Sequence, residues 1–205
     1  MQIKFGTDGW RAIIAQEFTT DNVARVAHAT GLWVKSISSS PAITIGHDCR
    51  FGGPLFTEVT IKVLCGLGVK VYAHKGICST PMVSLGCRTL NPTAGVVITA
   101  SHNPPSYNGF KLKSSFGGPT TPADIAKVEA LIPESAAIPA TSLEELAACG
   151  LLEYVDLETM YFNHVEQSFD MNAIRTCGMT FGYDAMYGAG QKITRRLLPS
   201  HLVYL

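Results

Sequence analysis

The chain has 205 residues, of which 46% are hydrophobic and only 16% are charged, so it can bury a core and is too poor in charge to remain disordered. Sixteen Lys and Arg balance sixteen Asp and Glu, which leaves no electrostatic basis for binding nucleic acid or an anionic membrane. No apolar run approaches the roughly 20 residues of a membrane-spanning helix, and Met1–Phe5 is not followed by the apolar stretch of a signal peptide. The six cysteines form no CxxC pair, so we expect reduced thiols in a cytoplasmic protein.

Short apolar segments alternate with helical patterns from the start of the chain. We expect strands at 10–14, 42–46, 69–73, 95–100 and 110–113, and helices at 19–38, 54–67, from 79 onward and at 121–131. The segment 95–100 is the most apolar and is expected at the centre of a sheet, whereas the alternation in 110–113 is typical of an edge or half-exposed strand. Repeated βα units predict a three-layer α/β/α sandwich with a mixed, mostly parallel sheet.

The pattern then breaks and restarts. Pro133 and Pro139 mark the break, a capping box at 142–145 and an amphipathic segment at 156–169 predict helices, and a strand, a helix and a strand are expected at 177–183, 189–198 and 201–205. We therefore divide the chain into a first domain (1–135), a helical connection (136–176) and the truncated beginning of a second, similar domain (177–205).

Polar motifs follow three of the predicted strands or turns. Ser101, in Thr99-Ala-Ser-His-Asn-Pro104, falls at the carboxyl end of the central strand, where ligand sites form in open α/β sheets. Lys111, ten residues later, is a candidate for holding a phosphate or moving a proton. The alternative is a polar βα turn with an Asx-type bend before the proline.

Two further motifs are less specific. In Gly6-Thr-Asp-Gly-Trp-Arg11, glycine permits close backbone approach and arginine binds phosphate bidentately, but Asp8-Gly9 is also a strong hairpin turn. In Gly46-His-Asp-Cys-Arg50, Asp48 and Arg50 form either part of a binding site or an ion pair that fixes the loop. Gly188-Ala-Gly190 is more consistent with a tight turn than with a phosphate loop, and the histidines show no metal spacing.

Taken in order, Phe5–Arg11, Gly46–Arg50, Ile98–Pro104 and Tyr107-Asn-Gly-Phe-Lys111 resemble the α-D-phosphohexomutases of the phosphoglucomutase/phosphomannomutase type. The resemblance is strong over residues 3–135 and weak over 177–205, through Gly182-Tyr-Asp-Ala-Met-Tyr-Gly-Ala-Gly190. It implies the sandwich fold of that family's first domain. It also implies an enzyme that interconverts hexose 1-phosphates and hexose 6-phosphates of glucose or mannose through a phosphoserine and a hexose 1,6-bisphosphate.

The same resemblance assigns roles to individual residues. It implies that Ser101 is the phosphorylated serine, that Lys111 and Arg11 transfer protons or stabilise charge, and that His102 and Asn103 line the serine loop. Substrate and phosphate binding would fall to Asp8, Gly9, Asn103, Asp48 and Arg50. Mg²⁺ would contact the phosphoryl oxygens on Ser101 and neutralise their charge.

Several parts of the family pattern are missing from the chain. The Asp-Gly-Asp-x-Asp metal loop of the second domain, the sugar-selecting Glu-x-Ser-Gly loop of the third and the phosphate-clamping fourth domain do not occur in it. We therefore expect the chain alone to be inactive in the turnover of hexose phosphates. The alternatives are a phosphoglucosamine mutase, although Trp10 and Phe110 favour the glucose/mannose branch, and a non-catalytic phosphate-binding or interaction module that self-associates through an exposed interdomain surface.

Overall fold

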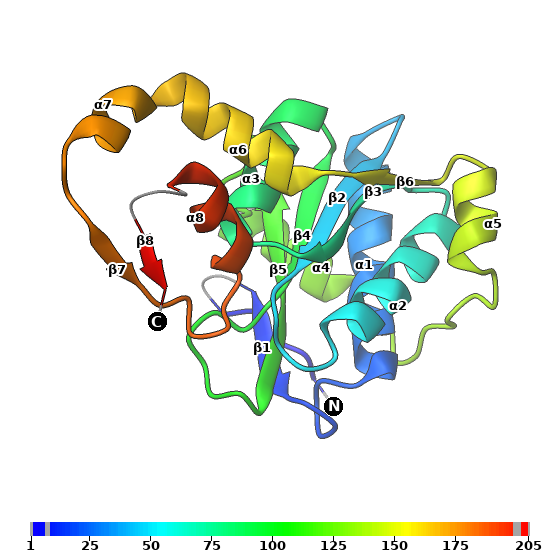
Figure 1. Ribbon diagram of the computed structural model, residues 1–205. Helices are drawn as coiled ribbons and strands as arrows, with labels where there is room; N and C mark the ends of the chain where they lie inside the picture. Colours follow the sequence, from blue (N-terminus) through cyan, green and yellow to red (C-terminus); the bar gives the residue numbers. More distant parts are fainter. Residues whose placement is uncertain (1, 7–8, 199–201, 205) are drawn as a thin grey trace.

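The computed structural model of the chain describes residues 2–6, 9–198 and 202–204, and it is built around a six-stranded sheet (Figure 1). The order across the sheet is β1-β5-β4-β2-β3-β6. The strands are β1 (Trp10–Ile13), β2 (Ala42–His47), β3 (Lys70–Ile77), β4 (Ala94–Ile98), β5 (Tyr107–Ser114) and β6 (Leu152–Val155). Neighbours from β4 to β6 pair in parallel, whereas β5 pairs antiparallel with both β1 and β4. The mixed, mostly parallel sheet predicted from the sequence is therefore confirmed.

Helices cover both faces of this sheet and complete the three layers. One layer holds α1 (Thr20–Ile37), which packs against α2 (Gly53–Gly66) and α4 (Pro122–Ala130), with the short α5 (Leu143–Ala148) beside α2. The other holds α3 (Thr80–Leu90) and α6 (Leu157–Ser168), which pack together. Alternate residues of β4 show the two faces: Val96 and Ile98 join the large core cluster, whereas Val97 joins the smaller one beneath α3 and α6.

Several helices begin where a side chain caps them, α1 and α5 among them. The Thr19 hydroxyl accepts a hydrogen bond from the Asn22 amide (3.3 Å) at the start of α1, and Ser142 and Glu145 form the predicted capping box of α5. Within the described residues, no helix is long and apolar enough to cross a membrane.

Two expectations about the sheet were wrong. Segment 110–113 belongs to β5, which lies inside the sheet between β1 and β4, and Lys111 and Lys113 are only 4% and 6% exposed. The alternation of apolar and charged residues indicated a half-exposed strand, but other parts of the chain cover these lysines: Gly9 packs against Lys111, and Cys87 of α3 lies beside Lys113. The connection 136–176 also contains a strand, β6, whose four residues include a single buried side chain, Leu152, and carry no alternating signal.

A separate unit follows the main sheet. The helix α7 (Met171–Thr176), which the sequence did not predict, leads to β7 (Phe181–Tyr183), α8 (Gln191–Leu197) and β8 (Leu202–Tyr204). β7 and β8 form their own parallel two-stranded sheet, to the left of the main sheet in Figure 1. This βαβ arrangement coincides with the segment in which the sequence pattern restarts.

Candidate active site

Ser101 lies at the carboxyl end of β4, on an exposed turn with left-handed backbone (φ 56°). A serine in this region is uncommon, and such conformations persist where the surroundings enforce them. Here the Ser101 amide donates to the Thr99 hydroxyl (3.0 Å), and that hydroxyl donates to Asp48 Oδ2 (2.5 Å). The Thr99 amide in turn donates to the Gly109 carbonyl on β5 (2.9 Å). The turn that presents the Ser101 hydroxyl is therefore held by neighbouring strands.

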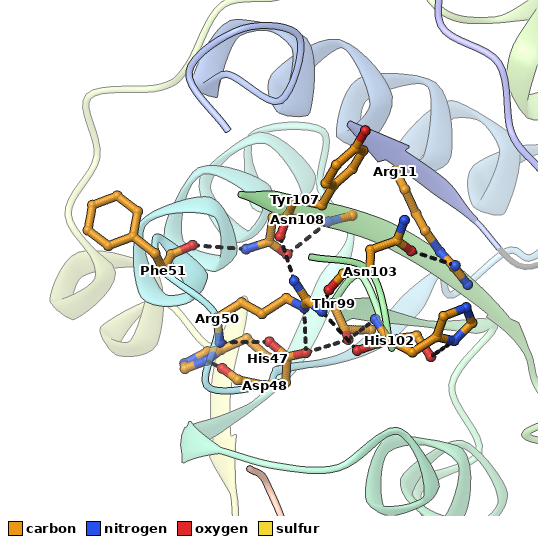
Figure 2. A network of polar contacts seen from close by, with 12 residues as sticks. Arg11, His47, Asp48, Arg50, Phe51, Thr99, His102, Asn103, Tyr107 and Asn108 are labelled. Atoms are coloured by element: carbon orange, nitrogen blue, oxygen red, sulfur yellow. Dashed lines mark hydrogen bonds and ion pairs between the residues drawn. The ribbon is translucent and has the colours of Figure 1, made fainter. Parts of the chain in front are cut away.

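Arg50 joins the β2–α2 loop to the serine loop (Figure 2). Its two terminal nitrogens donate to four backbone carbonyls, at 2.5–2.9 Å, and these belong to Ser101, Asn103, Pro104 and Tyr107. Its Nε lies 3.7 Å from Asp48 Oδ2. Asp48 and Arg50 therefore lie beside the serine loop, and they form the ion pair that was the alternative interpretation of this motif.

Asn108 forms a second bridge between these loops. Its side chain is fully buried, its Nδ2 donates to the Phe51 carbonyl (3.1 Å), and its Oδ1 accepts from the Gly109 amide (2.8 Å). This amide fastens the β2–α2 loop to β5, so the loop that carries Arg50 is itself anchored (Figure 2).

The other predicted residues surround the serine at different depths. Arg11 on β1 donates through Nη1 to Asn103 Oδ1 (2.8 Å), and His102 Nδ1 lies 3.4 Å from Ser101 Oγ. Lys111 is buried on β5, and Gly9 packs on it so closely that an added Cβ would lie 2.9 Å from Lys111 Cγ. The structure thus brings Arg11, His102 and Asn103 to the serine loop and places Lys111 under Gly9. Asp8 lies outside the described residues.

An open cleft of about 660 Å³ runs past Ser101, a volume typical of small-molecule sites. Of the predicted residues, Ser101, Asn103, Asp48 and Arg50 line it. The opposite lining comes from Ser79, Thr80 and Pro81 at the start of α3, from Phe51, and from the loop between β7 and α8.

The place of this β7–α8 loop in the cleft lining was not predicted from the sequence, in which Gly188–Gly190 was interpreted as a tight turn. Met186 and Tyr187 both have left-handed backbone (φ 44° and 57°) and are 80% and 89% exposed. No sequence signal marked the role of this loop, because single exposed apolar residues are common on protein surfaces.

The cleft contains neither an activated cysteine nor, among the described residues, a cluster of metal ligands. Partial burial, and then the charge of Asp48, raise the pKa of the Cys49 thiol, so it stays protonated at neutral pH. Among the described residues, no three His, Cys, Asp or Glu side chains gather to hold a metal ion, and Asp48 is already engaged by Thr99 and Arg50. The described residues do not by themselves fit the Mg²⁺ that the resemblance implies.

Residues 2–138 match the family model described as phosphoglucomutase/phosphomannomutase, alpha/beta/alpha domain I. The chain belongs to this family, the α-D-phosphohexomutases. A crystal structure described as a "putative phosphomannomutase" from Thermus thermophilus superposes on this phosphohexomutase chain with a TM-score of 0.91 and 32% identity, over 100% of this chain and 46% of that one.

Curated relatives of the phosphohexomutase chain point the same way. Phosphoglucosamine mutase of Prochlorococcus marinus strain MIT 9312 is 29% identical over 98% of this chain and 42% of its own length. That of Exiguobacterium sibiricum is 31% identical over 94% of this chain and 42% of its own. The chain therefore spans under half the length of these relatives.

Proposed function

We propose that this chain carries the phosphoserine side of a phosphohexomutase active site, in which Ser101 donates and accepts the phosphoryl group. The observation that carries the proposal is the Ser101 turn itself. Its hydroxyl is exposed to a cleft of substrate size, while its backbone is held in a left-handed conformation by Thr99, Asp48 and Arg50. Preorganised positioning of this kind is the main protein contribution to phosphoryl transfer.

The proposed reaction keeps both phosphoryl groups within the site. A hydroxyl of the hexose phosphate attacks the phosphorus on Ser101, the bond from phosphorus to Oγ breaks, and the hydroxyl proton passes to a base. The product is a hexose 1,6-bisphosphate. The bisphosphate then reorients within the site. Ser101 Oγ attacks its other phosphoryl group, and the second hexose phosphate leaves.

The neighbouring residues suit supporting roles in this sequence. Arg11 remains protonated, so we assign it to charge stabilisation and to holding Asn103, to which it donates at 2.8 Å. His102, with Nδ1 3.4 Å from Ser101 Oγ, is placed to exchange a proton with it. Lys111 is assigned to proton transfer or phosphate binding by the family resemblance.

The names of the similar proteins indicate two classes of substrate. The name of the Thermus structure favours a mannose or glucose phosphate, and the names of the Prochlorococcus and Exiguobacterium relatives favour a glucosamine phosphate. Since the chain spans under half the length of these relatives, the complete activity is proposed for the whole protein.

The test is phosphorylation of the purified chain by glucose, mannose or glucosamine 1,6-bisphosphate, followed by intact mass and peptide mapping. We expect one phosphoryl group on Ser101, removed by phosphatase and absent in Ser101→Ala. Ser106→Ala is the matched control, since Ser106 is an exposed serine of the same loop. Label in Ser101→Ala, or no label from any of the three donors, would refute the proposed role and favour a non-catalytic module.

A further inference from the structure

Arg50 was predicted to bind substrate or phosphate, yet its guanidinium faces the protein backbone. Nη1 donates to two carbonyls, at 2.8 and 2.9 Å, and Nη2 donates to two more, at 2.9 and 2.5 Å; the acceptors are Pro104, Tyr107, Ser101 and Asn103. Three of the four lie in the loop between β4 and β5, and the fourth, Tyr107, is the first residue of β5. The side chain of Arg50 therefore joins Ser101 to the end of the serine loop, where β5 begins; Arg50, Asn103 and Tyr107 are labelled in Figure 2.

The donors of Arg50 are mostly occupied by the protein itself. A guanidinium carries five N–H groups in a fixed plane. Four of them donate to the loop carbonyls, and the fifth, on Nε, forms an ion pair with Asp48 Oδ2 at 3.7 Å. A substrate phosphate could gain a hydrogen bond from Nη1 or Nη2 only if a loop carbonyl lost one.

Asp48 completes the arrangement from the other side. Its Oδ1 accepts a hydrogen bond from the Arg50 backbone amide (2.9 Å), and its Oδ2 accepts one from the Thr99 hydroxyl. The same Thr99 hydroxyl accepts a hydrogen bond from the Ser101 backbone amide. The carbonyl of Ser101 is thus held by Arg50 and its amide by Thr99. Both peptide groups around the left-handed residue are fixed, which is the restraint that an unfavourable backbone conformation requires.

We propose that Arg50 is a positioning residue that holds the Ser101 loop through its planar fork of donors and does not bind substrate phosphate. Its consequence for phosphoryl transfer rests on the function proposed above, whereas its effect on the loop does not. Lysine cannot replace it, because an ammonium has only three donors, on a single nitrogen, and cannot bond to four carbonyls at once. The shape of the guanidinium, and not its charge, is what the loop needs.

The test compares Arg50→Lys with Arg88→Lys, a matched control on the exposed surface of α3. Two measurements are made on each folded variant: amide hydrogen exchange over residues 101–108 without any ligand, and the rate of Ser101 phosphorylation by the hexose 1,6-bisphosphate that labels the unmodified chain. We expect Arg50→Lys to lose exchange protection in this loop and to be phosphorylated about 100-fold more slowly, the usual cost of misplacing a reacting group by about 1 Å. Arg88→Lys should change neither.

Chemical rescue provides a second variant. In Arg50→Ala, added guanidinium ion should restore part of the exchange protection, and ammonium ion at the same concentration should not. Retained loop protection in Arg50→Lys would overturn the proposal; if phosphorylation were nonetheless slow, Arg50 would act on the phosphate directly. If the unmodified chain takes up no phosphoryl group, the proposed function fails, and the exchange experiment still decides the role of Arg50.

Discussion

Replacing Gly109 with alanine tests how tightly the strands beneath the serine loop are packed. Gly109 is buried in β5, between Arg11 of β1 and the end of β4. A Cβ added there would lie 2.6 Å from the Thr99 carbonyl oxygen and 2.8 Å from that of Trp10. Both atoms are backbone, so neither can move aside as a side chain would. We therefore expect β5 to separate from β1 or from Thr99.

The cost can be estimated from its parts. Overpacking a rigid site costs about 1–3 kcal/mol, and weakening the hydrogen bond from the Thr99 amide to the Gly109 carbonyl costs about 1 kcal/mol. The lower entropy of the unfolded chain returns about 0.4–1 kcal/mol. The net destabilisation is about 1–3 kcal/mol, which lowers the melting temperature of a chain of this size by roughly 2–12 °C.

Urea denaturation followed by circular dichroism measures this loss, and Gly182→Ala is the control. Gly182 lies in β7, and an added Cβ there would meet no atom within 4 Å among the residues that the structure describes, so the free energy of unfolding of Gly182→Ala should change by less than about 1 kcal/mol. Equal stabilities of Gly109→Ala and Gly182→Ala would show that the backbone around Gly109 can shift to accommodate the added Cβ. That result would refute the view that a rigid sheet supports the serine loop.

Three further predictions concern the backbone, the thiols and one helix cap. Ser101→Gly should raise the free energy of unfolding by about 0–1.5 kcal/mol, because glycine adopts φ 56° without a strain of about 1–2 kcal/mol, whereas its more flexible unfolded chain costs about 0.4–1 kcal/mol; denaturation of this variant and of Ser101→Ala, which keeps the strain, checks it. Burial raises the pKa of three thiols to about 12, so alkylation of the native protein at pH 8 should spare Cys65, Cys78 and Cys87; peptide mapping that finds them labelled would contradict this. Hydrogen bonds from the backbone amide and then the hydroxyl of Thr159 lower the pKa of Asp156 at the start of α6. The stabilisation by its carboxylate is present above the ordinary pKa of about 3.9 and is lost as the pH falls through the lowered value, so Asp156→Asn should flatten this part of the acid unfolding curve.

The sequence predicted the sandwich well because most elements carry their own signals. The apolar run of β4 and the capping box of α5 are local patterns, and the structure has both where they were expected. The position of β5 was not predictable in this way. Phe110 and Leu112 alternate with Lys111 and Lys113 as in a half-exposed strand, and the lysines are buried by parts of the chain far away in sequence, Gly9 beside Lys111 and Cys87 of α3 beside Lys113. Strand neighbours are set by long-range pairing, which no short window of sequence contains.

The serine could be predicted from a local sequence pattern, whereas the residues that hold it could not. Ser101 could be located because a polar turn after a buried strand is a local pattern with a known meaning in α/β sheets. Arg50 lies about fifty residues earlier, and its four acceptors are backbone carbonyls, which every residue possesses and no sequence motif marks. An arginine beside a serine loop is therefore naturally assigned to phosphate, since phosphate is the ligand that its chemistry suggests. Only the directions of its N–H groups distinguish a ligand-binding arginine from a positioning one, and those directions depend on how two loops from neighbouring strands meet.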